Sequence, residues 1–509
     1  MTDQRTLAPN QVSQHNHTLA TDNRVDVCII GGGPAGFAAA MRALDFGLKV
    51  VLIERAKLGG AGVYDGALTS KTLWELSREA QNSRRRAEKY FQQCELIRFD
   101  EVLNEVQEAI YERKSMLEHH LYHLQRHADH NFRILSGDAS FIDPHTIEIK
   151  GTDGQVELLA AHNFVLATGS RPRYLPHLPI DEKIVMTSDG VKNLEEFPRS
   201  LVVLGAGVIG CEFTTIFSSF GRTQVKLICR EDRILSMEDP DISAAVEASL
   251  LRNGVTIHKN AELRKMEIRD GKVWYELCIS NDACHWFEAD NALVSIGRVA
   301  NTESLGLDHI GVQLKPNGFV LDDDTRTTVP HIYAVGDLTA DVSLVNVGEL
   351  EGRHAIELIA GLNPEPLRYD NISTIMFLNP EIAGVGLNET QAQAAKLPYR
   401  MAVLDYSNIA RAVAMRNTIG FFKILVTDED RPKILGMRAV GEHASSAIQA
   451  VALMIGTDTT IDHLADMIHP HPSIVEGVQE ALRMLLDRPI FKDWYPNQYH
   501  AVKRWAPVE

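Results

Sequence analysis

Two glycine-rich turns, each between a strand-like run and a helix-like run, constrain the fold of this chain more than any other feature. The strand-like runs are residues 25–30 and 200–204, and the helix-like runs are 37–44 and 211–220. The first turn carries Gly31, Gly33 and Gly36, and the second turn carries Gly205, Gly207 and Gly210. Both match G-x-G-x-x-G, in which missing side chains let the backbone approach a pyrophosphate that the helix N-terminus stabilises. Two copies about 170 residues apart predict an α/β protein with two Rossmann-like dinucleotide-binding domains.

The residue that ends the second strand of each copy is placed to contact the ribose of a nucleotide. In the first copy it is Glu54, 18 residues after the last glycine, whose carboxylate can accept hydrogen bonds from both ribose hydroxyls. In the second copy it is Cys229, so the acid that would repel a 2′-phosphate is missing, and Arg230 or Arg233 can pair with such a phosphate. In the alternative interpretation a neighbouring acid binds the ribose and both arginines are solvated. Those acids are Glu231 and Asp232. The sequence therefore leaves the choice between NAD and NADP open, with use of both included.

The composition is that of a soluble globular chain and disfavours several classes of partner. The 509 residues suffice for two to four domains. Acidic residues outnumber basic ones by 68 to 51, and the net charge of −17 disfavours a nucleic-acid partner. No apolar run reaches the roughly 18 residues of a membrane span, and residues 1–24 are polar and lack a secretory core. We therefore expect a cytoplasmic protein with a short disordered leader that binds neither membranes nor nucleic acid.

The segment from residue 59 to residue 71 reads G-G-A-G-V-Y-D-G-A-L-T-S-K. It resembles the active-site segment of the flavoprotein disulfide reductases, the family of dihydrolipoamide dehydrogenase and glutathione reductase, whose pattern is G-G-T-C-x-x-x-x-C-x-P-S-K. The frame of that pattern remains as Gly59, Gly60, Gly66, Ser70 and Lys71. The two cysteine positions hold Gly62 and Ala67, and neither residue can form a thiolate or a disulfide. The resemblance therefore implies a flavin site of this family without its redox disulfide.

Further segments resemble the same family, from about residue 25 to residue 486. They are an A-T-G-S-x-P element at 163–172, an I-G-R element at 293–298, and a Y-A-x-G-D motif that ends at Asp337. Residues 138–143 are similar to the soluble pyridine nucleotide transhydrogenases of this family. The resemblance implies an FAD-containing homodimer that uses NADH or NADPH. Together with the fingerprints it implies these cofactor-binding residues: Gly31, Gly33, Gly36, Glu54, Gly60, Lys71, Ala139, Thr168, Gly169, Ser170, Asp337, Leu344, Val345, Gly205, Gly207, Gly210, Arg230 and Gly297.

Four residues are the candidate catalytic groups that the resemblance implies. Lys71 and Glu212 occupy family positions that pair beside the site of hydride transfer, where a lysine favours negative charge on the reduced flavin. The run 469–476 is similar to H-x-H-P-T-x-x-E, which makes His471 the acid/base group and Glu476 the carboxylate that orients it. In the family, both reach the flavin of the other subunit. The alternatives are a structural salt bridge for the first pair and a packed interface histidine for the second.

The missing cysteines exclude the usual dithiol–disulfide exchange on chemical grounds. The leading hypothesis is an FAD-dependent NAD(P)H oxidoreductase that resembles the soluble pyridine nucleotide transhydrogenases, in which hydride enters and leaves through the nicotinamide site. The second is an NAD(P)H:quinone or small-acceptor reductase that uses His471 as a proton donor and binds its acceptor beside Gly62 and Ala67. The third is a catalytically silent flavin-binding scaffold or redox sensor.

The motifs divide the chain into six parts. These are a disordered leader (1–24), the first part of an FAD-binding domain (25–190), an NAD(P)-binding domain (191–292), a return segment of the FAD-binding domain (293–365), an α+β dimerisation domain (366–486) and an aromatic tail (487–509). The tail carries Pro489, Phe491, Trp494, Tyr495, Tyr499 and Trp505. We expect it to pack on a surface, and the alternative is a flap over the active site.

Cysteine and histidine spacing raises two further questions. Cys278 and Cys284 are close enough in sequence for a hairpin disulfide, but two free thiols are the preferred interpretation for a cytoplasmic protein. His119, His123 and His127 fall on one face of a long amphipathic helix, where a metal site is geometrically feasible. Neither a cysteine nor a clear set of carboxylates accompanies them, so we expect a solvated or partly packed face and no metal.

Overall fold

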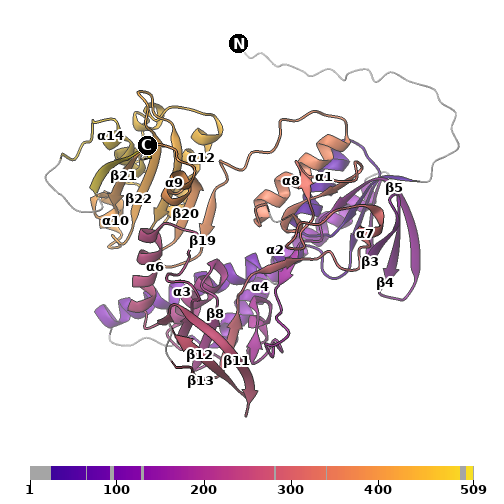
Figure 1. The fold of residues 1–509 in the computed structure, drawn as a ribbon, viewed down its shortest axis with the longest axis horizontal. Helices are drawn as coiled ribbons and strands as arrows, with labels where there is room; N and C mark the ends of the chain where they lie inside the picture. The colour runs from indigo at the N-terminus through magenta and orange to yellow at the C-terminus, as the bar shows by residue number, and fades with distance from the viewer. Residues whose placement is uncertain are drawn as a thin grey trace.

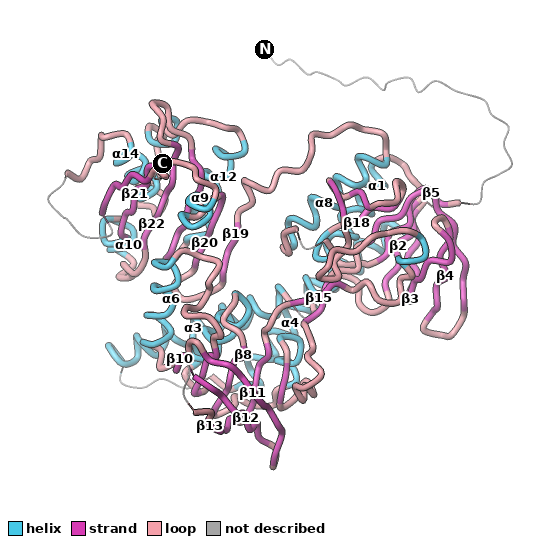
Figure 2. The backbone as a smooth tube through the Cα atoms, viewed as in Figure 1, coloured by secondary structure: helices cyan, strands magenta, loops and turns pink. Residues whose placement is uncertain are grey.

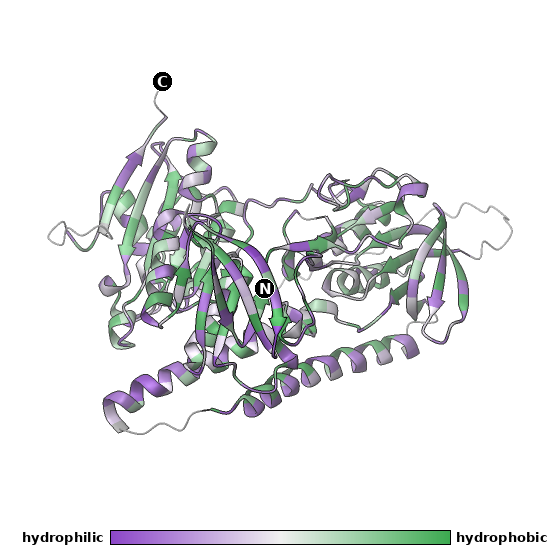
Figure 3. Ribbon diagram, turned by 60° about the horizontal axis from the view of Figure 1, so that its bottom comes forward, coloured by the Kyte–Doolittle hydropathy of each residue, from purple (hydrophilic) through white to green (hydrophobic). Residues whose placement is uncertain are grey.

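The computed structural model describes residues 24–64, 66–91, 97–127, 131–279, 283–339, 341–492 and 500–507, and the predicted leader lies outside these ranges apart from Arg24. The described chain folds into three bodies (Figure 1). The first combines the indigo N-terminal part with an orange return segment, the second is the magenta middle of the chain, and the third is the yellow C-terminal domain. Each body contains its own strands (Figure 2), and apolar residues concentrate in those strands (Figure 3), as expected for buried sheets.

The first nucleotide fold is organised on an eight-stranded sheet. Its strands are β1 (Val25–Ile30), β2 (Val50–Glu54), β3 (Phe132–Asp143), β4 (Thr146–Gly151), β5 (Val156–Leu166), β16 (Asp322–Asp323), β17 (Arg326–Thr327) and β18 (Ile332–Ala334). They follow the order β1-β2-β3-β4-β5-β18-β17-β16, and β1 also pairs with β5. Helices α1 (Pro34–Asp45) and α8 (Val345–Ile359) pack on each other beside this sheet. Gly352 permits this packing, because a Cβ there would lie 2.3 Å from the carbonyl oxygen of Ala35.

The second nucleotide fold is organised on a five-stranded parallel sheet of order β10-β9-β8-β14-β7. Its elements are β7 (Val185–Met186), β8 (Ser200–Leu204), α5 (Val208–Phe220), β9 (Gln224–Ile228), α6 (Pro240–Arg252), β10 (Thr256–His258) and β14 (Asn291–Val294). Helix α3 (Ala67–Arg86) comes from the first fold and packs on α5. The guanidinium of Arg84 donates to the carbonyls of Ser219 and Phe220 at the negative end of α5. The two nucleotide folds are therefore joined by a helix as well as by the chain.

The C-terminal domain contains a six-stranded antiparallel sheet of order β19-β20-β23-β22-β21-β24. Its elements include β19 (Thr374–Met376), β20 (Ile382–Gly386), α9 (Glu389–Ala394), β21 (Tyr399–Asp405), β22 (Phe421–Thr427), β23 (Ile434–Val440), α12 (Gln449–Gly456), α14 (Glu476–Leu485) and β24 (His500–Trp505). The last strand comes from the aromatic tail and pairs with β21. The ring of Trp505 stacks on Tyr399 at 5.5 Å, so this part of the tail packs on the sheet as predicted. The other tail aromatics at 493–499 lie outside the described residues.

A buried ionic cluster fixes the C-terminal domain to the second nucleotide fold. The amine of Lys423 on β22 is 1% exposed and lies 2.9 Å from Asp239, 2.8 Å from Asp241 and 2.6 Å from Glu389. Two of these carboxylates come from the start of α6 and one from α9. Burial lowers the pKa of the Lys423 amine, but the three carboxylates around it together outweigh burial, and the net shift of the pKa is upward.

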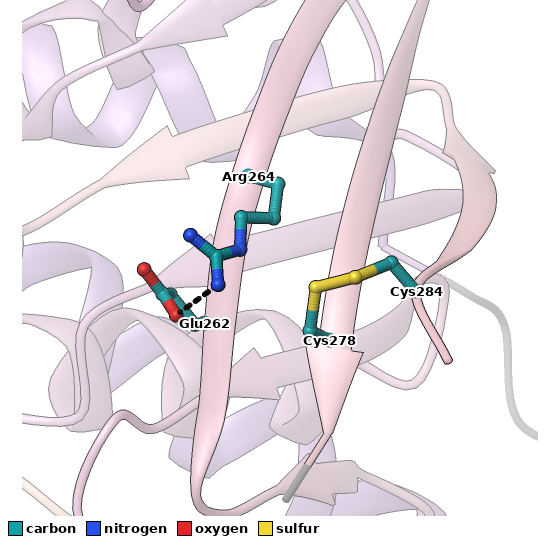
Figure 4. Close-up of a disulfide and its surroundings, with 4 residues drawn as sticks. All are labelled: Glu262, Arg264, Cys278 and Cys284. Atoms are coloured by element: carbon teal, nitrogen blue, oxygen red, sulfur yellow. Dashed lines mark ion pairs between the residues drawn. A yellow bond between two sulfur atoms is a disulfide. The ribbon is translucent and has the colours of Figure 1, made fainter. Parts of the chain in front are cut away.

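The prediction of two free thiols at Cys278 and Cys284 is wrong, because the structure joins them in a disulfide (Figure 4). Three antiparallel strands form the sheet that carries it: β11 (Ala261–Arg269), β12 (Lys272–Ile279) and β13 (His285–Ala289). The register pairs Leu277 with His285, which brings the Cα atoms of the two neighbouring cysteines to 4.2 Å. Hairpin pairing, which the spacing alone could not establish, therefore decides between the two alternatives.

The histidine-rich helix is α4 (Phe99–His127). The ring of His120 contacts the ring of Phe37 edge-on at 5.9 Å, and His123 contacts Tyr122 in the same way. Within the described ranges, no group of three or more His, Cys, Asp or Glu side chains is arranged to hold a metal ion. No helix in the same ranges is long and apolar enough to cross a membrane.

Candidate active site

The first glycine turn presents its backbone to open space at the start of α1. Gly31 has φ +111°, and a Cβ there would lie 2.3 Å from the carbonyl oxygen of Ala167. A Cβ on Gly36 would lie 1.9 Å from the carbonyl oxygen of Gly31. At Gly33, which caps α1 without a side-chain hydrogen bond, a Cβ would meet nothing within 4 Å. The first and third glycines thus close the turn, and the second leaves room for an anionic group at the helix N-terminus.

The second glycine turn repeats this geometry at the start of α5. Gly205 has φ +103°, and a Cβ there would lie 2.4 Å from the carbonyl oxygen of Ser295. A Cβ on Gly210 would lie 1.9 Å from the carbonyl oxygen of Gly205, and a Cβ on Gly207 would meet nothing within 4 Å. The duplication seen in the sequence is therefore also a duplication of a pyrophosphate cradle.

The residue that ends β2 supports the first turn directly. One carboxylate oxygen of Glu54 accepts a hydrogen bond from the backbone of Gly32 at 2.7 Å, and the other accepts from Ala56 at 2.8 Å. The predicted ribose ligand therefore lies against the turn that is predicted to bind the pyrophosphate. Arg230, the predicted ligand of the second fold, lies beside the end of β9 and is exposed.

A second group of predicted residues meets where the chain crosses between the two nucleotide folds. The strands β6 (Ser170–Pro172) and β15 (Arg298–Ala300) pair there. Ser170 donates to the carboxylate of Asp337 at 2.7 Å and receives a hydrogen bond from Nε of Arg298 at 2.7 Å. Thr168 is bonded in both directions to Asn301, at 2.8 Å each. Gly169, which follows Thr168, and Gly297, which precedes Arg298, both have positive φ and open space at the Cβ position.

Two further residues of this region were not predicted from the sequence to belong to the site. Arg298 belongs to the I-G-R element, so the motif itself was a signal for it. Glu351 on α8 had no such signal. It is buried, accepts a hydrogen bond from the backbone of Gly336 at 2.6 Å, and accepts another from the hydroxyl of Tyr369 at 3.0 Å. Burial raises the pKa of Glu351 to about 7, against the opposing effect of these two donors. It supports the turn that carries Asp337.

Lys71 and Glu212 form the predicted ion pair. The amine and the carboxylate lie 3.0 Å apart, with Lys71 30% and Glu212 6% exposed. The second carboxylate oxygen of Glu212 accepts a hydrogen bond from the backbone of Phe377 at 2.9 Å, and the amine lies 4.6 Å from the centre of the Phe377 ring. Lys71 lies in α3, which comes from the first fold, Glu212 lies in α5 of the second fold, and Phe377 follows β19 of the C-terminal domain. Segments from all three bodies of the chain therefore meet at this pair.

One of the two positions that hold cysteines in the family pattern, Gly62, lies beside the first turn. Gly62 is in α2 (Gly60–Val63), and a Cβ there would lie 2.7 Å from Cγ of Pro34 and 3.9 Å from Val345. A Cβ on Gly60 would lie 3.0 Å from Cα of Gly33. The short helix therefore rests on the start of α1 and near the start of α8, where Leu344 and Val345 were predicted to line the flavin site. Ala67 is the first residue of α3.

No thiol lies in this segment, because the sequence from 59 to 71 contains no cysteine. Elsewhere in the described chain the free cysteines are Cys28, Cys211 and Cys229, and all three are buried. Burial raises the pKa of each of these thiols, which disfavours the reactive thiolate. Ala139 is buried in β3, opposite Ile149.

His471 and Glu476 form the predicted dyad in the C-terminal domain. Nδ1 of His471 lies 2.7 Å from one carboxylate oxygen of Glu476, and the backbone of Ser473 donates to the other oxygen at 2.7 Å. Burial raises the pKa of Glu476, but the Ser473 and His471 bonds outweigh it and the net shift is downward. The His471 side chain is 70% exposed. A carboxylate on one imidazole nitrogen leaves the other nitrogen available for proton transfer.

The dyad lies in the C-terminal domain near α14, whereas the segment that lacks the family's cysteines contains α2 and lies in a different body of the chain (Figure 1). The single chain brings Lys71 to Glu212 and Gly62 to the first glycine turn, whereas His471 pairs with Glu476 in the C-terminal domain.

Two nucleotide cradles, an ion pair at the junction of three bodies and an antiparallel C-terminal domain define an α/β oxidoreductase with two Rossmann-like domains and a dimerisation domain, which confirms the predicted fold class. The chain belongs to the pyridine nucleotide-disulphide oxidoreductase family: residues 25–357 match the model of that name, and residues 372–482 match its dimerisation domain. The family uses FAD and NAD(P)H, and its dimerisation domain indicates a homodimer.

Curated relatives agree over nearly the whole chain. The dihydrolipoyl dehydrogenase of Chlamydia trachomatis is 33% identical over 477 residues, which cover 91% of this chain and 97% of that protein. The mercuric reductase of Lysinibacillus sphaericus is 32% identical and covers 94% and 86%. The crystal structure of LpdA from Mycobacterium tuberculosis superposes with a TM-score of 0.83 at 28% identity, covering 91% of this chain and all of that one. The flavoprotein disulfide reductase RclA of Escherichia coli, at 24% identity and a TM-score of 0.79, shares the fold.

Proposed function

We propose that this protein is an FAD-dependent NAD(P)H oxidoreductase that works without a disulfide relay and most closely resembles the soluble pyridine nucleotide transhydrogenases in function. The observation that carries the proposal is the replacement of both relay cysteines by Gly62 and Ala67 while the ion pair of Lys71 and Glu212 is retained. A disulfide substrate needs an enzyme thiolate to attack it, and a dithiol substrate needs an enzyme disulfide to oxidise it; this segment can form neither.

The first nucleotide fold fits FAD. The first glycine turn forms a cradle with open space at its centre, built from Gly31, Gly33 and Gly36. Glu54 lies where a carboxylate is needed to bind the hydroxyls of a ribose. Ser170 and Arg298 hold the carboxylate of Asp337 in place for the ribityl chain. When bound, FAD takes up hydride from a reduced nicotinamide and delivers it to a second acceptor.

Lys71 is positioned to stabilise the charge that hydride transfer creates. Its amine is held by Glu212 and by the face of the Phe377 ring, so its position is fixed before reaction. Glu212 is held in turn by the backbone of Phe377. In a transhydrogenase the donor and the acceptor are both nicotinamide nucleotides, so one site beside this lysine serves both half-reactions. We propose that the enzyme is a cytoplasmic homodimer.

A second candidate function is NAD(P)H:quinone reductase, and the dyad of His471 and Glu476 favours it. Reduction of a quinone to the quinol requires one hydride and one proton. An imidazole oriented by a carboxylate at 2.7 Å can supply that proton, whereas transfer between two nicotinamides has no evident need of it. The acceptor would then lie beside Gly62 and Ala67, facing the histidine of a second subunit.

An anaerobic experiment separates these functions. The purified protein is loaded with FAD and reduced with NADPH or NADH, and then receives either a thionicotinamide analogue of NAD⁺ or a soluble quinone. Fast reoxidation by the analogue supports transhydrogenation. Reoxidation by the quinone alone replaces it with the second candidate, and a flavin that neither nucleotide reduces refutes both and leaves a flavin-binding scaffold.

A further inference from the structure

The two nucleotide folds of this chain can be compared residue by residue, because their strand registers correspond. In the first fold Ile30 pairs with Ile53, and in the second Leu204 pairs with Ile228. The first glycine of each turn donates to the carbonyl of the paired strand, at 2.8 Å in the first fold and 3.1 Å in the second. The next residues, Glu54 and Cys229, therefore occupy equivalent places at the ends of their strands, where a dinucleotide-binding fold contacts the ribose.

The chemistry at these equivalent places is opposite. Glu54 brings a carboxylate to its turn and accepts a hydrogen bond from Gly32. Cys229 is buried, and its thiol donates to the carbonyl of Arg233 at 3.3 Å. Burial raises the pKa of Cys229, so the thiol is neutral at physiological pH. The second fold therefore lacks the negative charge that would accept ribose hydroxyls and repel a 2′-phosphate.

The structure also distinguishes the two arginines that follow. The guanidinium of Arg233 donates to the carbonyls of Ser236 at 2.8 Å and Glu238 at 3.2 Å, so it is held by its own loop. Arg230 is 83% exposed and is paired at 3.1 Å with Glu231, its neighbour in the chain. An exposed pair of this kind contributes little, so the guanidinium can turn to a phosphate at small cost.

The remaining charges near this place are also accounted for. Lys259 lies 2.8 Å from Glu247, and that hydrogen bond raises the pKa of the amine. The positive charge of this lysine is therefore already paired with a carboxylate. Glu231 and Asp232 are exposed, where water and salt screen their repulsion of a phosphate. Arg230 is thus the cation of this loop that is best placed to change partners, and arginine binds phosphate with two parallel hydrogen bonds.

We infer that the second nucleotide fold recognises the 2′-phosphate of NADPH through Arg230 and binds NADPH more tightly than NADH. This inference deepens the proposed function and rests on it for the assignment of the second fold to the nicotinamide nucleotide. NADH still fits the same cradle, because the glycine turn recognises only the pyrophosphate.

Calorimetric titration with the adenosine halves of the two nucleotides tests the inference without turnover. The full-length protein, kept in excess FAD so that the first fold is filled, is titrated with adenosine 2′,5′-bisphosphate and with adenosine 5′-monophosphate. We expect the bisphosphate to bind at least about tenfold more tightly, and Arg230→Ala to remove that difference. Arg230→Lys should keep part of it, because a lysine supplies the charge without the two parallel hydrogen bonds.

Arg222→Ala is the matched control, because Arg222 is an exposed arginine just before the other end of β9. It should leave the bisphosphate preference unchanged. Equal binding of the two adenosine nucleotides by the unaltered protein, or a preference that survives Arg230→Ala, overturns the inference while leaving the proposed function in place. If neither adenosine nucleotide binds, both the inference and the proposed function are overturned.

Discussion

Replacing Lys71 with methionine tests whether the ion pair with Glu212 holds the site together. Coulomb's law at 3.0 Å with an effective dielectric constant of about 20 gives about 5.5 kcal/mol. Lys71 is 30% exposed, so water screens part of this energy, and we expect about 2–3 kcal/mol. The substitution leaves the buried carboxylate of Glu212 with only the backbone donor of Phe377.

The assay is equilibrium urea unfolding of four proteins: the unaltered chain, Lys71→Met, Glu212→Gln and the double variant. Lys71→Met should lower the free energy of unfolding by about 2–3 kcal/mol alone and by less than about 0.5 kcal/mol in the Glu212→Gln background. The control pair is Lys114 and Glu118 on the surface of α4, 3.5 Å apart, with an expected coupling of about 0.3–0.5 kcal/mol. The same loss in both backgrounds of the Lys71 cycle would refute the reasoning.

The remaining predictions concern the domain junction, the buried glutamate and the dyad. Lys423→Met should lower the free energy of unfolding by about 3–5 kcal/mol, because it leaves the carboxylates of α6 and α9 without their cation; a loss below about 1 kcal/mol in urea unfolding would contradict this. Glu351, with a pKa of about 7 in the folded chain and an ordinary value of 4.5 when unfolded, binds more protons in the folded state, so its stabilisation is complete below about pH 4.5 and is lost as pH rises through 7. The difference in stability between the unaltered protein and Glu351→Gln should therefore change by about 3 kcal/mol between pH 4.5 and pH 8, and a constant difference would show that the carboxyl group does not titrate in this range. His471→Gln should slow quinone reduction by about 100-fold and change the transfer between nicotinamides by less than twofold, in steady-state assays of both reactions; equal loss in both would assign the histidine a structural role.

The local features of this chain could be read from its sequence because the backbone itself requires them. At Gly36 and Gly210 a side chain would collide with the turn that the glycine closes. The spacing of the glycines in the sequence therefore predicts the geometry of the turn. The place of Glu54 at the end of the second strand could be predicted from its spacing to the same glycines. The motifs that resemble the family predicted the pair of Lys71 and Glu212, which the structure contains, whereas Ser170 and Asp337 were predicted as separate flavin contacts and prove to be hydrogen-bonded to each other.

The features that the sequence did not reveal depend on contacts between distant segments. Arg298 meets Ser170 across 128 residues, and Glu351 on α8 meets Tyr369, which is 18 residues further along the chain. A glutamate in an amphipathic helix looks like a solvated residue until the fold buries it. The disulfide of Cys278 depended on the pairing of β12 with β13, which their spacing permits but does not require.

The central claim is that this member of a disulphide oxidoreductase family transfers hydride without any thiol. The most direct measurement is the rate of transfer from NADPH to thionicotinamide adenine dinucleotide before and after exhaustive alkylation of the native protein with N-ethylmaleimide. A parallel assay with lipoamide tests a disulfide as the acceptor. We expect alkylation to change the transfer rate by less than twofold and lipoamide to support no turnover. Loss of transfer on alkylation, or turnover with lipoamide, would contradict it.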